Sequence, residues 1–441
     1  MGKFRYLILI ILSIAIIKAF PESINHSVIV LDCLWKFHTG DEKHWSDQRF
    51  DDADWEKVDL TPTPGAHDND VGLLGYVKGW TAKGHPGYSG YAWYRIHINI
   101  AGEKISDLEM TGPPDVEDAY QVFANGFLLG SDGDFSGKTP TVYSIRPRIF
   151  SLSKARFAPK DGNDSLVIAF RVWVDAGTIK GSPDDAGGIH IAPTIGVKSG
   201  IEAIYHAQWL QSFWGYIVDA VEPLLFILLA ILTCNITLFY SSKRARRWFV
   251  LALLLTACVR ANQVLFFWAP YESNHAYDLI REVILTPLCL WAWLMTIRFW
   301  FGIENRLTWF PKVLNSLTIL FMVCRLFSLS WFFPGTFQPL KADFDIACNW
   351  FRIAFLALLI VLVLMGYRQR RHQHQLWLVM PAVILLATGL FAQELSIAHI
   401  PGIWFPYGIG VSRTQYAYAG FIIFMFSILI PLKRKEESHL S

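Results

Sequence analysis

Seven apolar stretches, each long enough to cross a bilayer, occupy the second half of this chain. A transmembrane helix needs about 20 consecutive, mostly apolar residues, and every backbone polar group inside a bilayer must be satisfied within the segment, which favours helices. The sequence therefore predicts an all-α transmembrane domain of seven helices at residues 210–433. The predicted spans are residues 213–240, 248–270, 279–301, 309–333, 346–367, 376–397 and 414–432.

Composition agrees with a chain that is partly dissolved in lipid. Of the 441 residues, 53% are hydrophobic and only 17% are charged, whereas soluble domains average about a quarter charged. The formal net charge is +2, so no overall field attracts nucleic acid and we expect no nucleic-acid partner.

Residues 1–20 have the composition of a secretory signal. Lys3 and Arg5 precede an apolar run from Tyr6 to Ile17, which matches the basic and apolar regions of a signal peptide. The following Lys18–Pro21 segment lacks a small-x-small cleavage triplet. A cleaved signal peptide and an uncleaved signal anchor both stay open, and either one exports the residues that follow.

The basic residues of the second half lie in alternate loops, which predicts an orientation. The loops after the second, fourth and sixth spans hold little beyond Lys341 and Arg413. By the positive-inside rule the other loops, which are rich in lysine and arginine, are cytoplasmic. Residues 28–205 are therefore expected outside, and a short tail, 434–441, in the cytoplasm. The richer set is Lys243, Arg244, Arg246, Arg247, Arg306, Lys312, Arg368, Arg370, Arg371, Lys433, Arg434 and Lys435.

Residues 28–205 are typical of an all-β sandwich. Apolar and polar residues alternate in 91–100 and in 166–174, as expected of half-buried strands. Asn125 and Gly126 between apolar runs predict a hairpin. About eight strands fit, enough for a jelly roll. Cys33 is the one cysteine here, so no disulfide is expected, and no Cys/His spacing predicts a metal site.

Six short motifs in this region carry a resemblance. They are Trp35-Lys36-Phe37 with Gly40-Asp41 and Trp45, Phe50 to Trp55, Tyr91 to Arg95, Val122 to Gly126 with Gly130, Asp164 to Ile168, and Gly187-Gly188-Ile189. In this order they resemble the galactose-binding-like jelly roll at the front of glycoside hydrolase family 2 enzymes. That module is a non-catalytic companion to a later barrel. Because no barrel follows, the resemblance implies a carbohydrate ligand and no hydrolysis.

Polar and aromatic loop residues are the candidates for ligand binding, since sugars are held by aromatic faces and bidentate polar groups. The alternative is that the aromatic members pack in the core. The candidates are Trp80, His85, Tyr88, Trp93, Asp115, Glu117 and Trp173.

Charged residues of both signs fall in the outer halves of the predicted spans. Such residues are costly in lipid and face protein or water, so they predict a paired polar network beneath the β domain. The alternative is that the arginines snorkel to the outer surface. The set is Asp219, Glu222, Arg260, Glu282, Arg325, Arg352 and Glu394.

A β domain followed by seven helices resembles the bacterial seven-transmembrane receptors with diverse intracellular signalling modules, which implies the bacterial inner membrane. The sequence departs from that family because only Lys433 to Ser441 follow the last span. We therefore expect a separate cytoplasmic signalling protein, or an effector module missing from this sequence.

Together these features predict a membrane sensor that binds an extracytoplasmic small molecule or glycan and has membrane lipid as its other partner. No catalytic constellation and no cofactor motif is found, so we do not expect an enzyme. One alternative is a transporter or membrane-complex subunit whose β domain captures substrate. Another is a structural envelope protein whose β domain docks a second protein.

Overall fold

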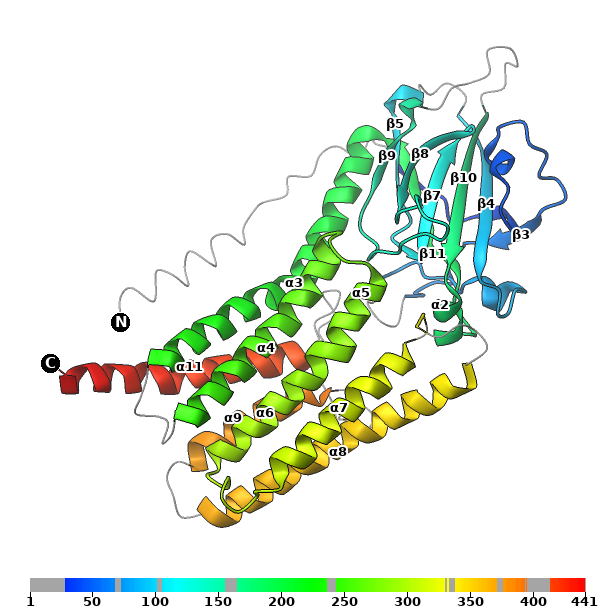
Figure 1. Ribbon diagram of the computed structural model, residues 1–441. Coiled ribbons are helices and arrows are strands. Elements are labelled where there is room, and N and C mark those ends of the chain that lie inside the picture. Colours follow the sequence, from blue (N-terminus) through cyan, green and yellow to red (C-terminus); the bar gives the residue numbers. More distant parts are fainter. Residues whose placement is uncertain are drawn as a thin grey trace.

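The chain consists of an antiparallel β domain followed by a bundle of long helices (Figure 1). This is the predicted order of β and α regions. The computed structural model describes residues 28–67, 73–100, 105–154, 165–235, 243–329, 331–332, 338–370, 376–392, 394 and 413–440. The predicted signal segment, 1–20, lies outside these residues.

The larger sheet of the β domain has six strands, all paired antiparallel. The alternating segments at 91–100 and 166–174 form its central pair, as predicted. Asn125 and Gly126, with φ of 48° and 85°, form the predicted hairpin turn. In spatial order the strands are β3 (Glu56–Asp59), β2 (Leu34–Thr39), β4 (Gly90–Asn99), β10 (Ser165–Val174), β7 (Ala119–Ala124) and β8 (Phe127–Asp132).

Two smaller sheets complete the domain. The main hydrophobic core lies between sheets, because Met110 and Ile195 of the four-stranded sheet cluster with Phe37 and Phe170 of the six-stranded one. The four-stranded sheet has the order β1 (Val28–Val30), β12 (Thr194–Val197), β5 (Leu108–Thr111) and β9 (Ile149–Ser151). The remaining pair is β6 (Asp115–Glu117) with β11 (Gly188–Ile191).

The outer face of β4 is covered, which corrects the expectation of a half-buried strand. Trp93 and Arg95 are both 0% exposed, because the segment between β2 and β3 folds over them. Trp45 and Trp55 of that segment cluster with Trp93. Arg95 Nε donates to Asp52 Oδ2 at 2.8 Å, and its other nitrogens bond backbone carbonyls of the same segment. The sheet is thus buried on both faces along half of β4.

Short helical turns connect the strands, and long helices follow the last strand. The short turns are η1 (Lys43–Ser46), η2 (Trp80–Lys83), η3 (Ile105–Asp107), η4 (Leu152–Lys154) and α2 (Ala176–Gly181). The long segments are α3 (Lys198–Asn235), α4 (Lys243–Trp268), α5 (Asn274–Asp278) with the π-helical η5 (Leu279–Leu285) and α6 (Thr286–Trp300), α7 (Phe310–Ser328), α8 (Gln338–Arg370), α9 (Leu376–Leu390) and α11 (Arg413–Leu440).

Five helical segments of the described chain are long and apolar enough to cross a membrane, so the chain is a membrane protein. Two shorter apolar helices, Val379–Leu390 and Gln415–Ile430, fall within the sixth and seventh predicted spans. The five longer segments are Lys198–Cys234, Lys243–Trp268, Asn274–Trp300, Phe310–Ser328 and Leu340–Gln369.

Two predicted boundaries differ from the structure. Helix α3 begins at Lys198, directly after β12, although the β domain was expected to extend to residue 205. Its first turns carry many polar residues, which hydropathy does not detect, and the fully buried Ile201 fixes them where α3 packs on β5 and β12. At the other end, α11 continues to Leu440, so most of the expected tail, 434–441, is helical.

Candidate functional site

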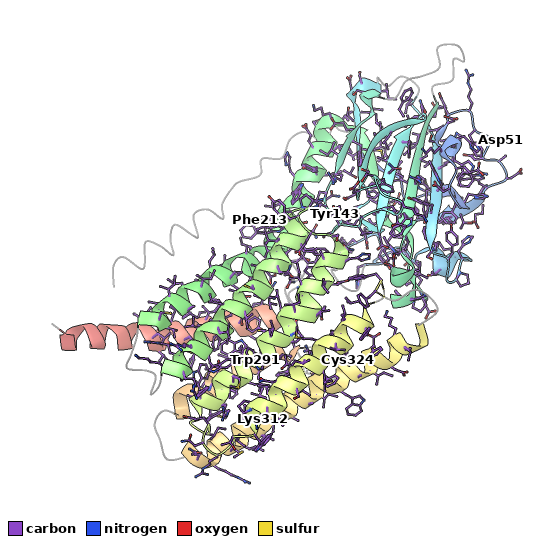
Figure 2. The ribbon with its side chains drawn as sticks, in the orientation of Figure 1. Asp51, Tyr143, Phe213, Trp291, Lys312 and Cys324 are labelled. Atoms are coloured by element: carbon purple, nitrogen blue, oxygen red, sulfur yellow. The ribbon has the colours of Figure 1, made fainter. Side chains whose placement is uncertain are left out.

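A cavity of about 560 Å³, which we call the junction cavity, lies where the β domain meets the first half of α3 and the last turn of α4. Figure 2 labels Phe213 of α3 and Tyr143 of the β domain in the region where the two parts of the chain meet. The β domain contributes the polar side chains Tyr76, Asp115, Glu117, Arg146, Asp185 and His190. The helices contribute Gln208, Gln211, Ser212, Tyr216 and Phe267.

The pairing of β6 with β11 brings the acidic and histidine side chains together. Glu117 lies opposite Gly188, and Asp115 lies opposite Ile191. Successive strand residues point to opposite faces, so Val116, which is 2% exposed and part of the core, leaves Asp115 and Glu117 to face the cavity. Two neighbouring strands therefore form one polar wall.

His190 is held in one tautomer at this wall. Its Nδ1 lies 3.0 Å from the carbonyl oxygen of Val77, and since a carbonyl only accepts, Nδ1 carries a proton. Its Nε2 is buried and lies 3.5 Å from Glu117 Oε2. Burial lowers the pKa of His190, but the bonding and charge of Glu117, the charge of Asp115 and the Val77 carbonyl outweigh it and raise the pKa above 6.5.

Aromatic rings and hydrogen-bonding groups line the rest of the cavity. The ring of Tyr76 stacks on His190 with centroids 5.0 Å apart and planes 4° apart. Burial and the neighbouring Asp185 raise the pKa of Tyr76, so its hydroxyl stays protonated. Tyr216 stacks on Phe267 at 4.2 Å. Within the described residues, no group of three His, Cys, Asp or Glu side chains could hold a metal ion.

Below the cavity, buried charges pair between helices. Arg260 of α4 donates from Nε to Glu222 Oε2 of α3 at 2.7 Å and also forms an ion pair with Asp219. Asp219, Glu222 and Arg260 are only 0%, 2% and 3% exposed. Gln415 of α11 donates to Asp219 as well. Three helices thus meet at one cluster of charges, which we call the Arg260 cluster.

Two further pairs account for the other charged residues expected in the spans. Arg325 of α7 donates to Glu282 of η5 at 2.8 Å. Arg352 of α8 donates to Glu394 Oε2 at 2.8 Å and to the carbonyl of Leu390 at 3.1 Å. All seven residues of the predicted network are therefore in ion pairs, arranged in three groups.

The predicted ligand residues separate into two sets. Asp115 and Glu117 line the junction cavity. Trp80 and Trp93 are 0% exposed and Trp173 is 9% exposed, so their rings pack inside the β domain and offer no exposed face to a sugar.

The remaining two candidates bond within the β domain. His85 Nε2 lies 2.7 Å from Glu56 Oε1. The Tyr88 hydroxyl donates to the Tyr91 carbonyl and accepts from the Gly40 amide at 2.9 Å. Neither residue lines the junction cavity. Loops rich in glycine and polar residues suggested exposure, but these loops fold back onto the sheet.

Several residues of the cavity were not anticipated from the sequence. His190 lies between two apolar residues in a strand, and Gln208 and Gln211 are three residues apart on one face of α3. A polar residue in an apolar strand, or a pair of polar residues on one helix face, was the sequence signal that could have identified these cavity residues. Tyr76 and Asp185 lie in connecting segments and carry no such pattern.

Comparison with known proteins gives only distant structural similarity. No family model matches the chain, and no curated protein matches it. A β-glucuronidase from Bacteroides uniformis is 15% identical over 39% of this chain and 18% of its own, with a TM-score of 0.27. A β-glycosidase from Bacteroides vulgatus is 20% identical over 38% of this chain and 20% of its own, with a TM-score of 0.24. A β-glucuronidase from Ruminococcus gnavus is 11% identical over 41% of this chain and 31% of its own, with a TM-score of 0.26. The chain spans less than a third of each enzyme, and TM-scores this low assign no activity.

Proposed function

We propose that this chain is a membrane receptor that binds an extracytoplasmic ligand in the junction cavity and passes a conformational signal through its helices to a cytoplasmic protein. In this proposal the β domain lies outside a bacterial inner membrane and seven helices cross it. The alternation of basic loops supports that orientation. Binding, with no chemical step, is the proposed activity.

The continuity of α3 is the observation that carries the proposal. This single helix begins next to β12, supplies Gln208, Gln211 and Tyr216 to the junction cavity, and then carries Asp219 and Glu222 of the Arg260 cluster. Figure 1 shows it running from the β domain into the bundle. A displacement of its outer turns by a ligand therefore reaches the buried charges without crossing a loop.

The Arg260 cluster has the properties of a switch, because its ion pairs can adopt only a few distinct arrangements. A buried charge that loses its partner is strongly destabilised, so Arg260 exchanges its partners Asp219 and Glu222 in steps and does not shift gradually. Packed interfaces likewise switch between arrangements and do not deform continuously. A change at α3 then alters how α4 and α11 pack, which is a signal on the opposite side of the membrane.

The cavity lining favours a polyhydroxylated ligand such as a saccharide. Carboxylates of Asp115, Glu117 and Asp185 accept hydrogen bonds from hydroxyls, and Gln208 and Gln211 both donate and accept. Tyr76, which is partly exposed and lines the cavity, provides aromatic surface for the apolar face of a sugar ring. A volume of about 560 Å³ lies within the range of small-molecule sites.

The test uses the full chain in lipid nanodiscs and a panel of soluble mono- and oligosaccharides. A fluorophore on Cys234, which is exposed near the inner end of α3, reports helix movement once Cys33, Cys258 and Cys324 are replaced. We expect binding and a fluorescence change for the wild type, and loss of both in Gln211→Leu. Arg260→Lys should keep binding and lose the fluorescence change.

Glu202→Gln is the matched control, because Glu202 is on α3 but outside the cavity. If no saccharide binds, or if binding leaves the fluorescence unchanged, the receptor proposal fails. Uptake of a bound saccharide into sealed vesicles would instead support the transporter alternative.

A further inference from the structure

A second cavity, of about 440 Å³, lies at the other end of the bundle and is basic. It is formed where α4 begins and α6 ends. Three arginines, Arg244, Arg247 and Arg298, line it together with an apolar wall that includes Trp248, Leu251 and Phe299. We call it the arginine cavity. Nothing in the receptor proposal uses it.

Two of the arginines belong to the first turns of α4. Arg244 and Arg247 are three residues apart, so they share one face of the helix, and both side chains are exposed. Within the described part of the chain, neither forms a salt bridge with an acidic residue. The amino-terminal end of α4 adds the positive end of a helix dipole. This part of the cavity therefore attracts an anion.

The third arginine is buried and incompletely bonded. Arg298 is 6% exposed, and its NH2 group donates to the carbonyls of Glu304 and Leu307 at 2.5 Å and 2.9 Å. Those two bonds fix the guanidinium against the wall. Its Nε is buried and has no hydrogen-bond partner among the described residues. Glu304 attracts the guanidinium of Arg298 and Arg244 repels it, and a bound anion would counter the repulsion and supply the missing bond to Nε.

The apolar wall distinguishes the kinds of anion that fit. A free phosphate ion needs only donors, whereas Leu251, Met295 and Phe299 present apolar surface beside the arginines. Trp248 beside them has the amphipathic character of residues at the headgroup level of a bilayer. Charge and apolar surface next to each other at the end of membrane-spanning helices match a lipid molecule, whose phosphate and acyl chains are joined.

We propose that the arginine cavity binds the phosphate-bearing headgroup of an anionic phospholipid from the leaflet at the start of α4. The headgroup phosphate bonds Arg244, Arg247 and the free Nε of Arg298, and the upper acyl chain lies on Leu251 and Phe299. Under the proposed orientation this is the cytoplasmic leaflet, the side on which basic segments meet anionic lipid.

Native mass spectrometry of the full chain in detergent, with phosphatidylglycerol as the probe, tests the proposal. One arginine near an anionic surface contributes roughly five-fold in affinity, so Arg244→Gln with Arg247→Gln should weaken phosphatidylglycerol binding on the order of 25-fold. Arg246→Gln removes one positive charge from a position between them that lies outside the cavity, and should change binding about two-fold or less, compared with about five-fold for either single variant at Arg244 or Arg247. Phosphatidylcholine should bind more weakly than phosphatidylglycerol to the wild type.

Inorganic phosphate added at millimolar concentration separates the two sources of the anion. If it displaces phosphatidylglycerol, or if Arg246→Gln weakens binding as much as the double variant, the proposal is wrong. Because Arg244 and Arg247 are exposed, their variants should fold, and an unchanged melting temperature without lipid verifies this. A phosphatidylglycerol-dependent shift of Trp248 fluorescence that is lost in the double variant gives a second readout.

Discussion

Arg260 Nε of α4 lies 2.7 Å from Glu222 Oε2 of α3, and both side chains are almost completely removed from solvent. Asp219 shares the same guanidinium. Two carboxylates therefore depend on one arginine for their neutralisation, and Gln415 supplies the additional donor. This dependence makes Arg260 the residue whose loss the helices can tolerate least.

Arg260→Gln should lower the free energy of unfolding by about 3–5 kcal/mol, because it leaves two buried carboxylates without a cation. Thermal unfolding of the full chain in nanodiscs measures the effect. Lys198→Gln is the control, since it breaks an exposed pair with Glu202 whose side chains are 65% and 47% exposed and should cost less than about 1 kcal/mol. Equal losses in the two variants would contradict the account of a buried cluster.

Glu117→Gln should lower the pKa of His190, since Glu117 is the main group that favours the imidazolium against burial. The raised pKa means that the His190–Glu117 contact stabilises the fold fully at low pH and that this stabilisation is lost as pH rises past 6.5. NMR titration of ring-labelled histidine, with His190→Gln for assignment, reports the pKa. Glu109→Gln, on β5, should leave it unchanged; a decrease there would show that the effect is not local.

The wild type should lose stability as pH rises from about 4 to 7, and Asp118→Asn should not show this loss. Burial, together with the charges of Glu117 and Asp175, raises the pKa of Asp118 to about 7 despite hydrogen bonds from Asp175 and Thr178. The native state therefore holds a proton that the unfolded state releases at lower pH, so stability falls as pH rises through this window.

When pH is raised from 4 to 8, the free energy of unfolding of Asp118→Asn should therefore increase relative to that of the wild type by on the order of 3 kcal/mol. Thermal unfolding of the full chain at both pH values measures it. The control is Asp134→Asn, because Asp134 is exposed and hydrogen bonds from Ser136 lower its pKa, which gives no gain at alkaline pH. A wild type with equal stability at pH 4 and pH 8 would rule this account out.

Gly188→Ala should destabilise the β domain more than Gly84→Ala. Both glycines have positive φ, +89° and +104°, so both substitutions introduce backbone strain of about 1–3 kcal/mol. At Gly188 the new Cβ would also lie 2.1 Å from the Tyr94 hydroxyl, whereas nothing lies within 4 Å at Gly84. Comparing the two melting temperatures isolates the steric part, and equal shifts would mean that Tyr94 moves aside without cost.

Local patterns in the sequence predicted much of the fold. Alternation located β4 and β10, the Asn125-Gly126 pair located their neighbouring hairpin, and apolar length located the helices. The predicted set of intramembrane charges is paired because an unpaired charge is too costly there. Each of these features depends on residues close together in the chain or on one dominant energy term.

Features that depend on distant segments were not predictable in the same way. The junction cavity combines Glu117, His190 and Gln211, which meet only because β6 pairs with β11 and α3 packs beneath them. Trp93 was expected to face a ligand, and the segment containing Trp45 and Trp55 covers it instead. Spacing along the chain does not reveal which loop covers which strand face.

The uninterrupted course of α3 also determines where this helix can bend. Pro223 lies within it, directly after Glu222. Proline has no amide hydrogen and removes one bond of the helical ladder, so bending stiffness is lowest at that point and kinks concentrate there. The turn of α3 that bends most easily is thus next to the carboxylate that Arg260 holds, so a bend of this helix changes its packing against α4 first.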